Sequence, residues 1–353
     1  MWACTSRPQT ASALSRAKSL MSRGVQKADR HDHQEAIEDY TQALRLYPDF
    51  ANAYYNRGVS RNELGDAKGA IEDYTQAIRF DPDLALAYGN RGSARANQRE
   101  WKQAVEDLNQ AIRLDPAHAR FYVNRGLVRG KLDDKPGALD DLQQATHLYH
   151  QQRNAKGARE VAEAFYQLGK GKWGTLTSDE KRQKAIWGEA IEYYSHAIRL
   201  RPDFAEAYDA RGSARHFLGD HNGAIEDASR AIHLDPAQAY FYANRASARR
   251  ALADWRGAVE DYTQAIRLQP QDADHYLRRG DARYELGDKP GALEDYTQAI
   301  RLKDDRARAY DNRGAVRAAL GDTPGALQDF QRAADLYLHS SLHDALPIWK
   351  SVV

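Results

Sequence analysis

One stretch decides the fold of this chain: residues 51–82 read ANAYYNRGVSRNELGDAKGAIEDYTQAIRFDP. Within it, residues 70–78 place apolar side chains at helical spacing with polar residues between them. Pro82 then ends the helical pattern, because proline has no backbone N–H and its ring clashes with the preceding turn. We therefore predict that this stretch forms a hairpin of two antiparallel helices.

The stretch recurs along the chain. Prolines follow one another at steps of 34 residues at Pro48, Pro82 and Pro116, and again at Pro202, Pro236 and Pro270. The 86 residues from Pro116 to Pro202 equal two repeats of 34 plus 18 additional residues. Counted from 31 residues before each proline, nine repeats fill residues 17–340 and begin at 17, 51, 85, 119, 162, 205, 239, 273 and 307. Repeats four and five are nine residues longer, and equivalent residues carry the same position number below.

Small residues hold three positions of the repeat. Positions 20 and 27 are alanine in all nine repeats, and position 8 is glycine in every repeat except at Ala246. Close approach of two helices requires such small residues. We predict that position 4 supplies the large side chains that these small sites receive and is part of the core: Leu20, Tyr54, Tyr88, Tyr122, Phe165, Tyr208, Tyr242, Tyr276 and Tyr310.

The pattern resembles the tetratricopeptide repeat, with residues 51–58, Gly65-Asp66, Ala70, Ala77 and Pro82 matching its consensus. The resemblance implies an all-α, right-handed superhelical solenoid of about nine antiparallel helix pairs, whose first helices line a concave face that binds peptides or proteins. We expect an N-terminal segment over 1–16, repeats one to four over 17–161 with the fourth extended, repeats five to nine over 162–340 with an enlarged loop in the fifth, and a non-native tail over 341–353.

An ion pair also recurs. Position 7 is arginine and position 23 is aspartate in the same eight repeats, whereas repeat five has Leu168 and Tyr193. Joint loss of both members favours a structural bridge within each hairpin over a row of arginines that captures acidic ligands. The pairs are Arg23 with Asp39, Arg57 with Asp73, Arg91 with Asp107, Arg125 with Asp141, Arg211 with Asp227, Arg245 with Asp261, Arg279 with Asp295, and Arg313 with Asp329.

The candidate binding surface follows from the resemblance, which places position 6 on the concave face. An asparagine there offers a donor and an acceptor to a peptide backbone, although solvated asparagine would give the same pattern. The candidate residues at position 6 are Asn56, Asn90, Asn124, Gln167, Asn244, Arg278 and Asn312, and the neighbouring candidates are Tyr55, Val59 and Leu127. The uninterrupted run Asn56, Asn90 and Asn124 is the preferred site. No repeat has lysine at position 5, so a carboxylate clamp is not supported.

The additions in repeats four and five leave two interpretations open, a docking site or a linker between two repeat blocks. Thr177 and Glu180 have capping-box spacing and predict an early, lengthened second helix in repeat five. Trp173 is predicted to be exposed in a basic loop. Beyond Ser340, residues 341–353 resemble translated sequencing-adapter DNA, which would leave repeat nine uncapped and able to self-associate.

Composition narrows the function. Lys and Arg number 51 and Asp and Glu 50, so no cationic excess supports a nucleic-acid groove or a membrane surface. One cysteine excludes an internal disulfide framework. We find no nucleophile, metal or cofactor motif and expect a cytoplasmic scaffold that binds a peptide or protein and is not an enzyme. The alternative is the substrate-recognition arm of a larger enzyme, for example a glycosyltransferase or kinase.

Overall fold

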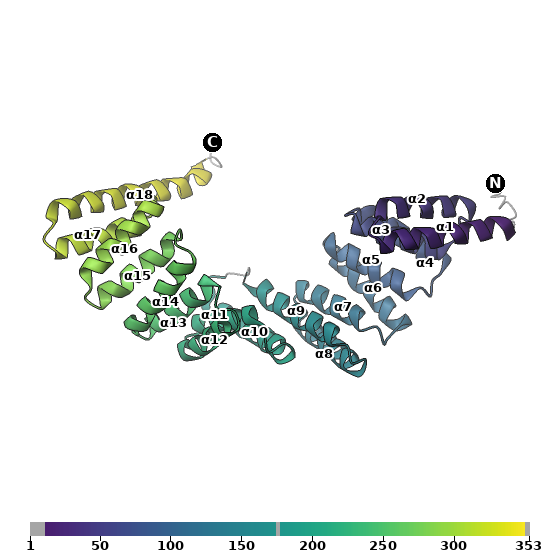
Figure 1. Cartoon of the computed structure of the whole chain (residues 1–353), viewed down its shortest axis with the longest axis horizontal. Coiled ribbons are helices and arrows are strands. Elements are labelled where there is room, and N and C mark those ends of the chain that lie inside the picture. Colours follow the sequence, from purple (N-terminus) through teal and green to yellow (C-terminus); the bar gives the residue numbers. More distant parts are fainter. Residues whose placement is uncertain (1–10, 174–176, 350–353) are drawn as a thin grey trace. The chain divides into compact units, whose positions relative to one another are not determined.

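The computed structural model describes the backbone of residues 11–173 and 177–349, and side chains as far as Leu338. Within these ranges the chain is entirely helical (Figure 1). The helices are α1 (Ala11–Asp29), α2 (His33–Leu46), α3 (Ala51–Glu63), α4 (Ala67–Phe80), α5 (Ala85–Asn97), α6 (Trp101–Leu114), α7 (Ala119–Lys131), α8 (Lys135–Gln151), α9 (Ala155–Lys172), α10 (Glu180–Leu200), α11 (Ala205–Phe217), α12 (His221–Leu234), α13 (Ala239–Ala251), α14 (Trp255–Leu268), α15 (Ala273–Glu285), α16 (Lys289–Leu302), α17 (Ala307–Ala319) and α18 (Thr323–Trp349).

The helices pack in consecutive pairs, which confirms the predicted all-α repeat fold. In repeats one to four and six to nine the first helix packs on the second, and in repeats one to three and five to eight the second helix packs on the first helix of the next repeat. Contacts divide the chain into two compact units, of which the first ends at Leu168 and the second begins at Gly169, inside α9. Each unit is a stack of helix pairs. No helix in the described part of the chain is long and apolar enough to span a membrane.

The small positions of the repeat behave as close-approach sites, but the large partner differs from the prediction. A Cβ atom on Gly58 would lie 2.8 Å from a ring carbon of Tyr74, and one on Gly280 would lie 2.7 Å from Tyr296. Both tyrosines come from position 24 of the second helix. The prediction that position 4 fills this site is therefore wrong, because a ring on the second helix already occupies the space above the glycine.

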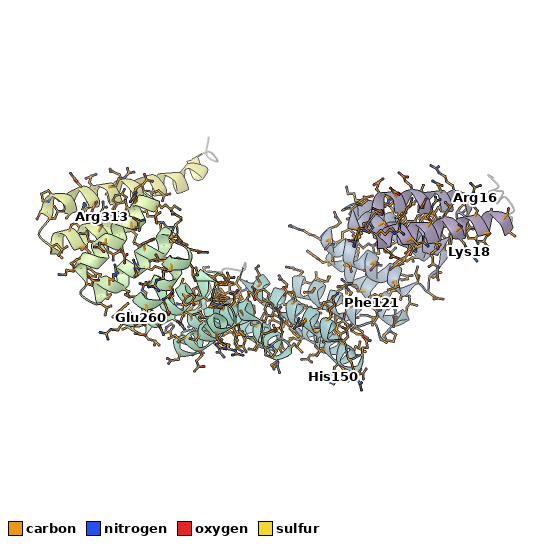
Figure 2. All side chains as sticks on the ribbon, in the orientation of Figure 1. Arg16, Lys18, Phe121, His150, Glu260 and Arg313 are labelled. Carbon is orange, nitrogen blue, oxygen red and sulfur yellow. The ribbon has the colours of Figure 1, made fainter. Side chains whose placement is uncertain are left out.

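Position 4 has another role. Its aromatic rings are half-buried except for Phe165, which is buried. The ring of Tyr54 lies 5.5 Å from the guanidinium carbon of Arg57, and the same pairing recurs in the other repeats that have tyrosine and arginine at these positions. Such cation–π contacts hold the arginine against its own helix. Between repeats, Phe121 of α7, which Figure 2 labels, packs against Gly89 of α5.

The additions in repeats four and five lengthen helices. In repeat four, α8 continues to Gln151, and α9 already begins at Ala155. In repeat five, α10 begins at Glu180, so the early, lengthened second helix is confirmed. The predicted capping box is wrong, because the cap is Asp179, whose carboxylate accepts from the backbone N–H of Arg182.

Trp173 is not the exposed residue that the sequence suggested. Its indole N–H donates to the Tyr194 hydroxyl at 2.8 Å, and its ring packs 4.5 Å from that of Trp187. Phe217 completes the aromatic cluster. Aromatic packing therefore accounts for this tryptophan, and a docking role for the additions stays a prediction.

Candidate functional site

The eight predicted arginine–aspartate pairs all lie in contact, with shortest N–O distances of 2.5–2.7 Å. Arg57 is representative: Nε and Nη2 donate to the two carboxylate oxygens of Asp73 at 2.9 and 2.6 Å. Arg91 with Asp107 and Arg245 with Asp261 repeat this two-bond geometry. Bidentate pairing of this kind gives geometric specificity as well as energy. Each pair joins the two helices of one hairpin.

The remaining amino group of the same arginine reaches the preceding repeat. Arg57 Nη1 donates to the Thr41 hydroxyl at 3.1 Å, and Arg125 Nη1 donates to Asn109 Oδ1 at 2.6 Å. Arg91, Arg211, Arg245 and Arg279 make the same contact to a threonine or serine at position 25. Because the guanidinium is bonded to its own repeat and to its neighbour, the arginine row is part of the scaffold.

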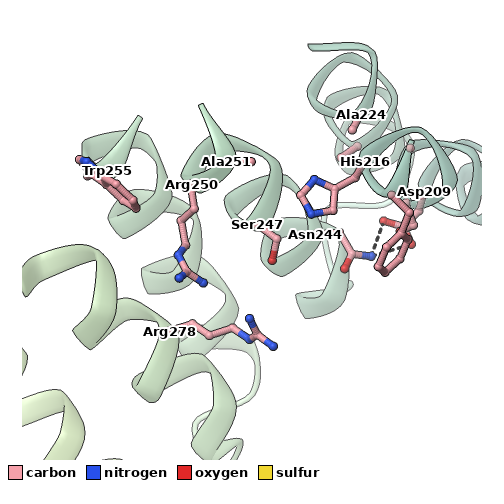
Figure 3. Close-up of a pocket in the computed structure, with 13 residues that line it drawn as sticks. Asp209, His216, Ala224, Asn244, Ser247, Arg250, Ala251, Trp255 and Arg278 are labelled. Atoms are coloured by element: carbon pink, nitrogen blue, oxygen red, sulfur yellow. Dashed lines mark hydrogen bonds between the residues drawn. The ribbon is translucent and has the colours of Figure 1, made fainter. Parts of the chain in front are cut away.

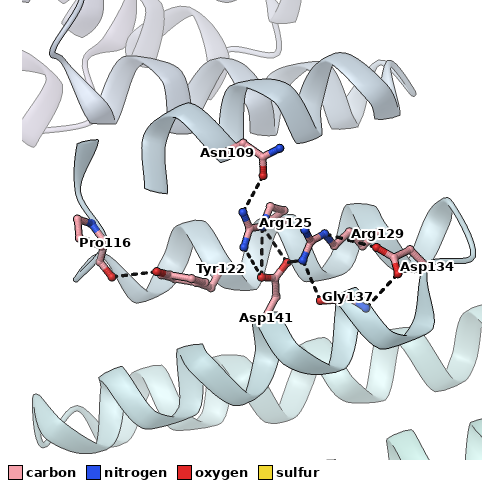
Figure 4. Close-up of polar contacts among 8 residues, drawn as sticks. All are labelled: Asn109, Pro116, Tyr122, Arg125, Arg129, Asp134, Gly137 and Asp141. Atoms are coloured by element: carbon pink, nitrogen blue, oxygen red, sulfur yellow. Dashed lines mark hydrogen bonds and ion pairs between the residues drawn. The ribbon is translucent and has the colours of Figure 1, made fainter. Parts of the chain in front are cut away.

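A second cation at position 11 shares each aspartate, as Figure 4 shows for repeat four. There Arg129 contacts Asp141 at 2.9 Å and also donates to the Gly137 carbonyl oxygen. Asp134 caps α8 by accepting from the Gly137 N–H and lies 3.5 Å from Arg129. Sequence reasoning missed this network. The recurrence of arginine at position 11, with lysine at Lys27 and Lys172, would have revealed it.

The position-6 amides point to the neighbouring repeat. Asn90 Nδ2 donates to the Tyr55 hydroxyl at 3.2 Å, and Asn124 Nδ2 donates to Ser93 Oγ at 2.8 Å. In the second unit, Asn244 donates to both carboxylate oxygens of Asp209 at 3.0 Å, and Asn312 donates to Asp281 at 2.9 Å. These amides therefore use an N–H to fix the repeat interface and keep their carbonyl oxygen for other partners.

The other predicted residues lie in different surroundings. Asn56 donates to the Asn52 carbonyl oxygen of its own helix, and Gln167 donates to Glu163. Val59 and Tyr55 pack against the buried cluster formed by Ala70, Tyr74 and Ala94. Burial raises the pKa of the Tyr55 hydroxyl, and the bond from Asn90 opposes this rise. Arg278 is exposed and makes no hydrogen bond or ion pair with another described residue.

The first unit brings three of the predicted residues together around one cavity. Asn124, Leu127 and Gln167 line a cavity of about 440 Å³. Trp101 and Lys131 also line it, and neither was among the predicted residues. The cavity thus combines apolar and aromatic walls with amides and two cations, Arg99 and Lys131, which is a composition that suits a peptide side chain.

The second unit holds a larger cavity of about 530 Å³ (Figure 3). Asn244 and Arg278 line it together with Asp209, His216, Arg250 and Trp255. A smaller cavity of about 290 Å³ shares Arg250 and Trp255 with it and includes Asn312 and Asp281. The cavity walls use positions 12 and 17 as well as the predicted positions 5, 6 and 9.

Two ionisable groups of the larger cavity have shifted pKa values. Burial raises the pKa of Asp209 to about 7, the bond from Asn244 opposes this rise, and the charge of Asp227 adds to it. Burial lowers the pKa of His216, and His221, whose Nδ1 lies 3.0 Å from that of His216, lowers it further. Among the described residues, no group of three or more His, Cys, Asp and Glu side chains is placed to hold a metal ion.

Sequence comparisons match this repeat geometry. Models described as tetratricopeptide repeats match residues 23–85, 90–149 and 205–238, and one described as TPR repeat matches residues 246–287 and 280–321. The chain belongs to the tetratricopeptide-repeat family. A search of curated proteins found no match.

Solved structures of tetratricopeptide-repeat proteins are similar to parts of this chain. A crystal structure of MamA is 26% identical, with a TM-score of 0.44 over 47% of this chain and 98% of MamA. A tetratricopeptide repeat protein from Parabacteroides merdae is 18% identical, with a TM-score of 0.46 over 72% and 94% of the two chains. YrrB, described as a TPR protein with an unusual peptide-binding site, is 19% identical, with a TM-score of 0.41 over 56% and 92%.

Proposed function

We propose that this tetratricopeptide-repeat protein is an interaction scaffold that binds an extended segment of a partner protein along the first helices of its repeats. The observation that carries the proposal is the position of the cavities. The three cavities described above, one in the first unit and two in the second, are lined mainly by positions 5, 6, 9, 12 and 13 of consecutive first helices. A peptide that follows these helices would meet one such set of side chains in each repeat.

The chemistry of these walls suits a peptide better than a small substrate. Amide carbonyl oxygens stand at position 6 in repeats two to five, seven and nine, so those of consecutive repeats can accept from successive backbone N–H groups whatever the peptide sequence. The residues between them differ from repeat to repeat and would select side chains. The framework residues of the ion-pair network, in contrast, are already paired within the scaffold.

A displayed library of random 12-residue peptides tests the proposal. We expect wild-type protein to select peptides, and the combined Asn56→Ala, Asn90→Ala and Asn124→Ala variant to bind those that use the first unit at least about tenfold more weakly. The matched control changes Glu72, Glu106 and Asp140 to alanine, because these exposed residues lie on the second helices of the same repeats. Selection of no peptide, or equal binding by the two triple variants of every selected peptide, would contradict the proposal.

A further inference from the structure

Repeat six differs from the other eight at position 24. It has Ala228, whereas the others have a large side chain there: Tyr40, Tyr74, Leu108, Leu142, Tyr194, Tyr262, Tyr296 and Phe330. In repeat eight this side chain covers the position-8 glycine, as described above for Tyr296 and Gly280. In repeat six, the atoms nearest to a Cβ built on Gly212 are the Ala224 carbonyl oxygen and Asp227 Cβ, both at 3.1 Å. The space that a ring fills elsewhere is therefore not filled by one here.

That space belongs to the 530 Å³ cavity. Gly212, Ser213, Ala224 and Ala228 form part of its wall. Ala228 is 2% exposed, so it lies between the helices of the repeat and not on its outer surface. A volume of this size is within the range of ligand-binding pockets. The repeat thus retains the framework of its neighbours but lacks one core side chain.

A polar group lies beside the missing ring. Asp209 is 7% exposed and is held by Asn244, as described above. In repeats seven and eight the position-24 hydroxyl has a comparable partner: Tyr262 lies 3.1 Å from Ser247 Oγ, and Tyr296 donates to Asp281 at 3.1 Å. A phenol that entered repeat six would find Ser213 at the position of Ser247, with the Asp209 carboxyl in the same cavity.

Two arginines lie at the other end of the cavity. Figure 3 shows Arg250 and Arg278 on the side away from Asp209 and Asn244. Arg250 Nε is buried without a hydrogen-bond partner among the described residues, and its Nη2 lies 3.5 Å from Asp281. Arg278 is exposed, as noted above. Guanidinium groups with unused donors pair well with carboxylates.

We propose that the cavity of repeat six is the acceptor site for one tyrosine side chain of a partner peptide, whose neighbouring acidic residues bind Arg250 and Arg278. The inference rests on the scaffold function proposed above and specifies the partner's chemistry. The tyrosine replaces the ring that Ala228 lacks, and its hydroxyl bonds to Ser213 or Asp209. The carboxylates of the partner peptide remain at the mouth, beside the exposed Arg278 and the partly exposed Arg250.

Filling the cavity tests the proposal. The probe is the acetylated and amidated peptide Ala-Tyr-Glu-Glu-Ala, titrated calorimetrically. We expect Ala228→Tyr to weaken binding at least about tenfold, because the protein then supplies the ring itself. Four other repeats pair tyrosine with glycine at these positions, so the variant should fold, and thermal unfolding checks this. If it does not fold, Ala228→Leu reproduces the pairing found in repeats three and four.

Changes in the peptide test the tyrosine site and the arginine end of the cavity separately. Replacing its tyrosine by alanine, or both glutamates by glutamine, should each weaken binding about tenfold. The Arg250→Gln and Arg278→Gln double variant should bind the original peptide as weakly as wild-type protein binds the glutamine peptide. Arg256→Gln, at an exposed position of α14, should not change the affinity. p-Cresol should compete with the peptide for the wild type but not bind Ala228→Tyr.

Several results would overturn the inference. Equal binding by wild type and a folded Ala228→Tyr variant would show that repeat six accepts no ring. Equal binding of the tyrosine and alanine peptides would have the same meaning. If wild-type protein self-associated and Ala228→Tyr abolished this, the occupant would be a second copy of the chain. Library peptides that lose affinity on the Asn56, Asn90 and Asn124 variant but not on Ala228→Tyr would leave the scaffold function standing without this site.

Discussion

Asp73 lies between two guanidinium groups and is almost entirely shielded from water. Arg57 binds both of its carboxylate oxygens, and Arg61 contacts one of them at 2.9 Å. Burial of a carboxylate costs several kcal/mol unless partners compensate its charge. The aspartate and its two cations recur in most repeats, so the free-energy cost of burying the carboxylate is offset by partners within the same hairpin.

A double-mutant cycle measures this coupling. Because Arg57→Ala leaves Asp73 with one cation in place of two, we expect it to lower the free energy of unfolding by about 1–3 kcal/mol. The combined Arg57→Ala and Asp73→Ala variant should lose less than the sum of the single variants, with a coupling energy of about 1–3 kcal/mol. Urea denaturation provides the measurement.

The cycle for Arg61 and Asp73 is the matched control. Arg61 makes a single contact with Asp73 and is more exposed than Arg57, so its coupling should be smaller. Additive losses for Arg57 and Asp73 would show that the pair contributes no interaction energy. A larger coupling for Arg61 would reverse the assignment of the main partner.

Asp209 gives a pH-dependent prediction. Its pKa is about 7 in the folded protein, against 3.8 as the ordinary value, so between these pH values the folded state binds a proton that the unfolded chain has lost. The free energy of unfolding therefore falls as pH rises through this window. Asp209→Asn removes the charge and should stabilise the protein at pH 8, by at most about 4 kcal/mol, but not at pH 4.

Urea denaturation at the two pH values checks the Asp209 prediction. Asp311→Asn is the control, because Asp311 has the same position in repeat nine but is exposed. That variant should show the same small change at both pH values. If Asp209→Asn stabilised the protein equally at pH 4 and pH 8, titration of Asp209 would not be the cause.

At the scale of the helices, the turn between the two helices of a repeat requires a left-handed residue at position 15. Gly65, Gly219, Gly287 and Gly321 have φ between 82° and 89°, whereas repeat seven uses Ala253 at φ 58°. A side chain with Cβ in this conformation costs about 1–2 kcal/mol, and glycine avoids this cost.

We therefore expect Ala253→Gly to raise the free energy of unfolding by about 0.5–1 kcal/mol, since the unfolded chain gains some freedom in return. The reverse change, Gly287→Ala, should lower it by a similar amount in the next repeat. Thermal and urea unfolding measure both variants. A loss of stability with Ala253→Gly would show that the alanine makes a contact worth more than the strain.

The sequence predicted these elements well because each repeat has the same spacing of small residues, charges and proline. It did not identify position 24 as the source of the ring that covers the position-8 glycine. Aromatic residues recur at both position 4 and position 24, and only three-dimensional packing distinguishes the two. For the same reason the sequence alone could not show that Ala228 leaves a core position without its large side chain. The packing of Tyr74 and Tyr296 against the position-8 glycines of their repeats was needed to show this. The arginine–aspartate pairs were predictable because repeat five lacks both members.

The candidate site was predicted only in part. Of the candidates at position 6, five line cavities, namely Asn124, Gln167, Asn244, Arg278 and Asn312, and peptide binding by them stays a prediction. The sequence could not show that these asparagines donate to side chains of the preceding repeat, because their partners lie 31–35 residues away. Arg250 was missed because position 12 differs from repeat to repeat, and Trp255 was missed although tryptophan recurs at position 17, at Trp101, Trp187 and Trp255.

For the whole molecule, stacking means that a repeat is stabilised mainly by its neighbours. In repeat eight, Tyr296 is 2% exposed because α17 covers α16, whereas Phe330 at the same position of α18 is 37% exposed. Leu327 and Leu338 are also exposed on α18. Exposed apolar residues that recur at helical spacing form a face on which another helix can pack.

The self-association predicted from the sequence can be tested on this face. We expect the mass measured by light scattering to rise with concentration for the wild type, and to stay at that of one chain for Leu327→Glu with Leu338→Glu, because two charges oppose burial of the face. Leu252→Glu with Leu286→Glu is the control, because these two leucines are also exposed in the second unit but lie at the C-terminal ends of α13 and α15, away from α18 in the sequence. A wild type that is monomeric at every concentration would refute self-association, and a control that dissociates equally would place it on another surface.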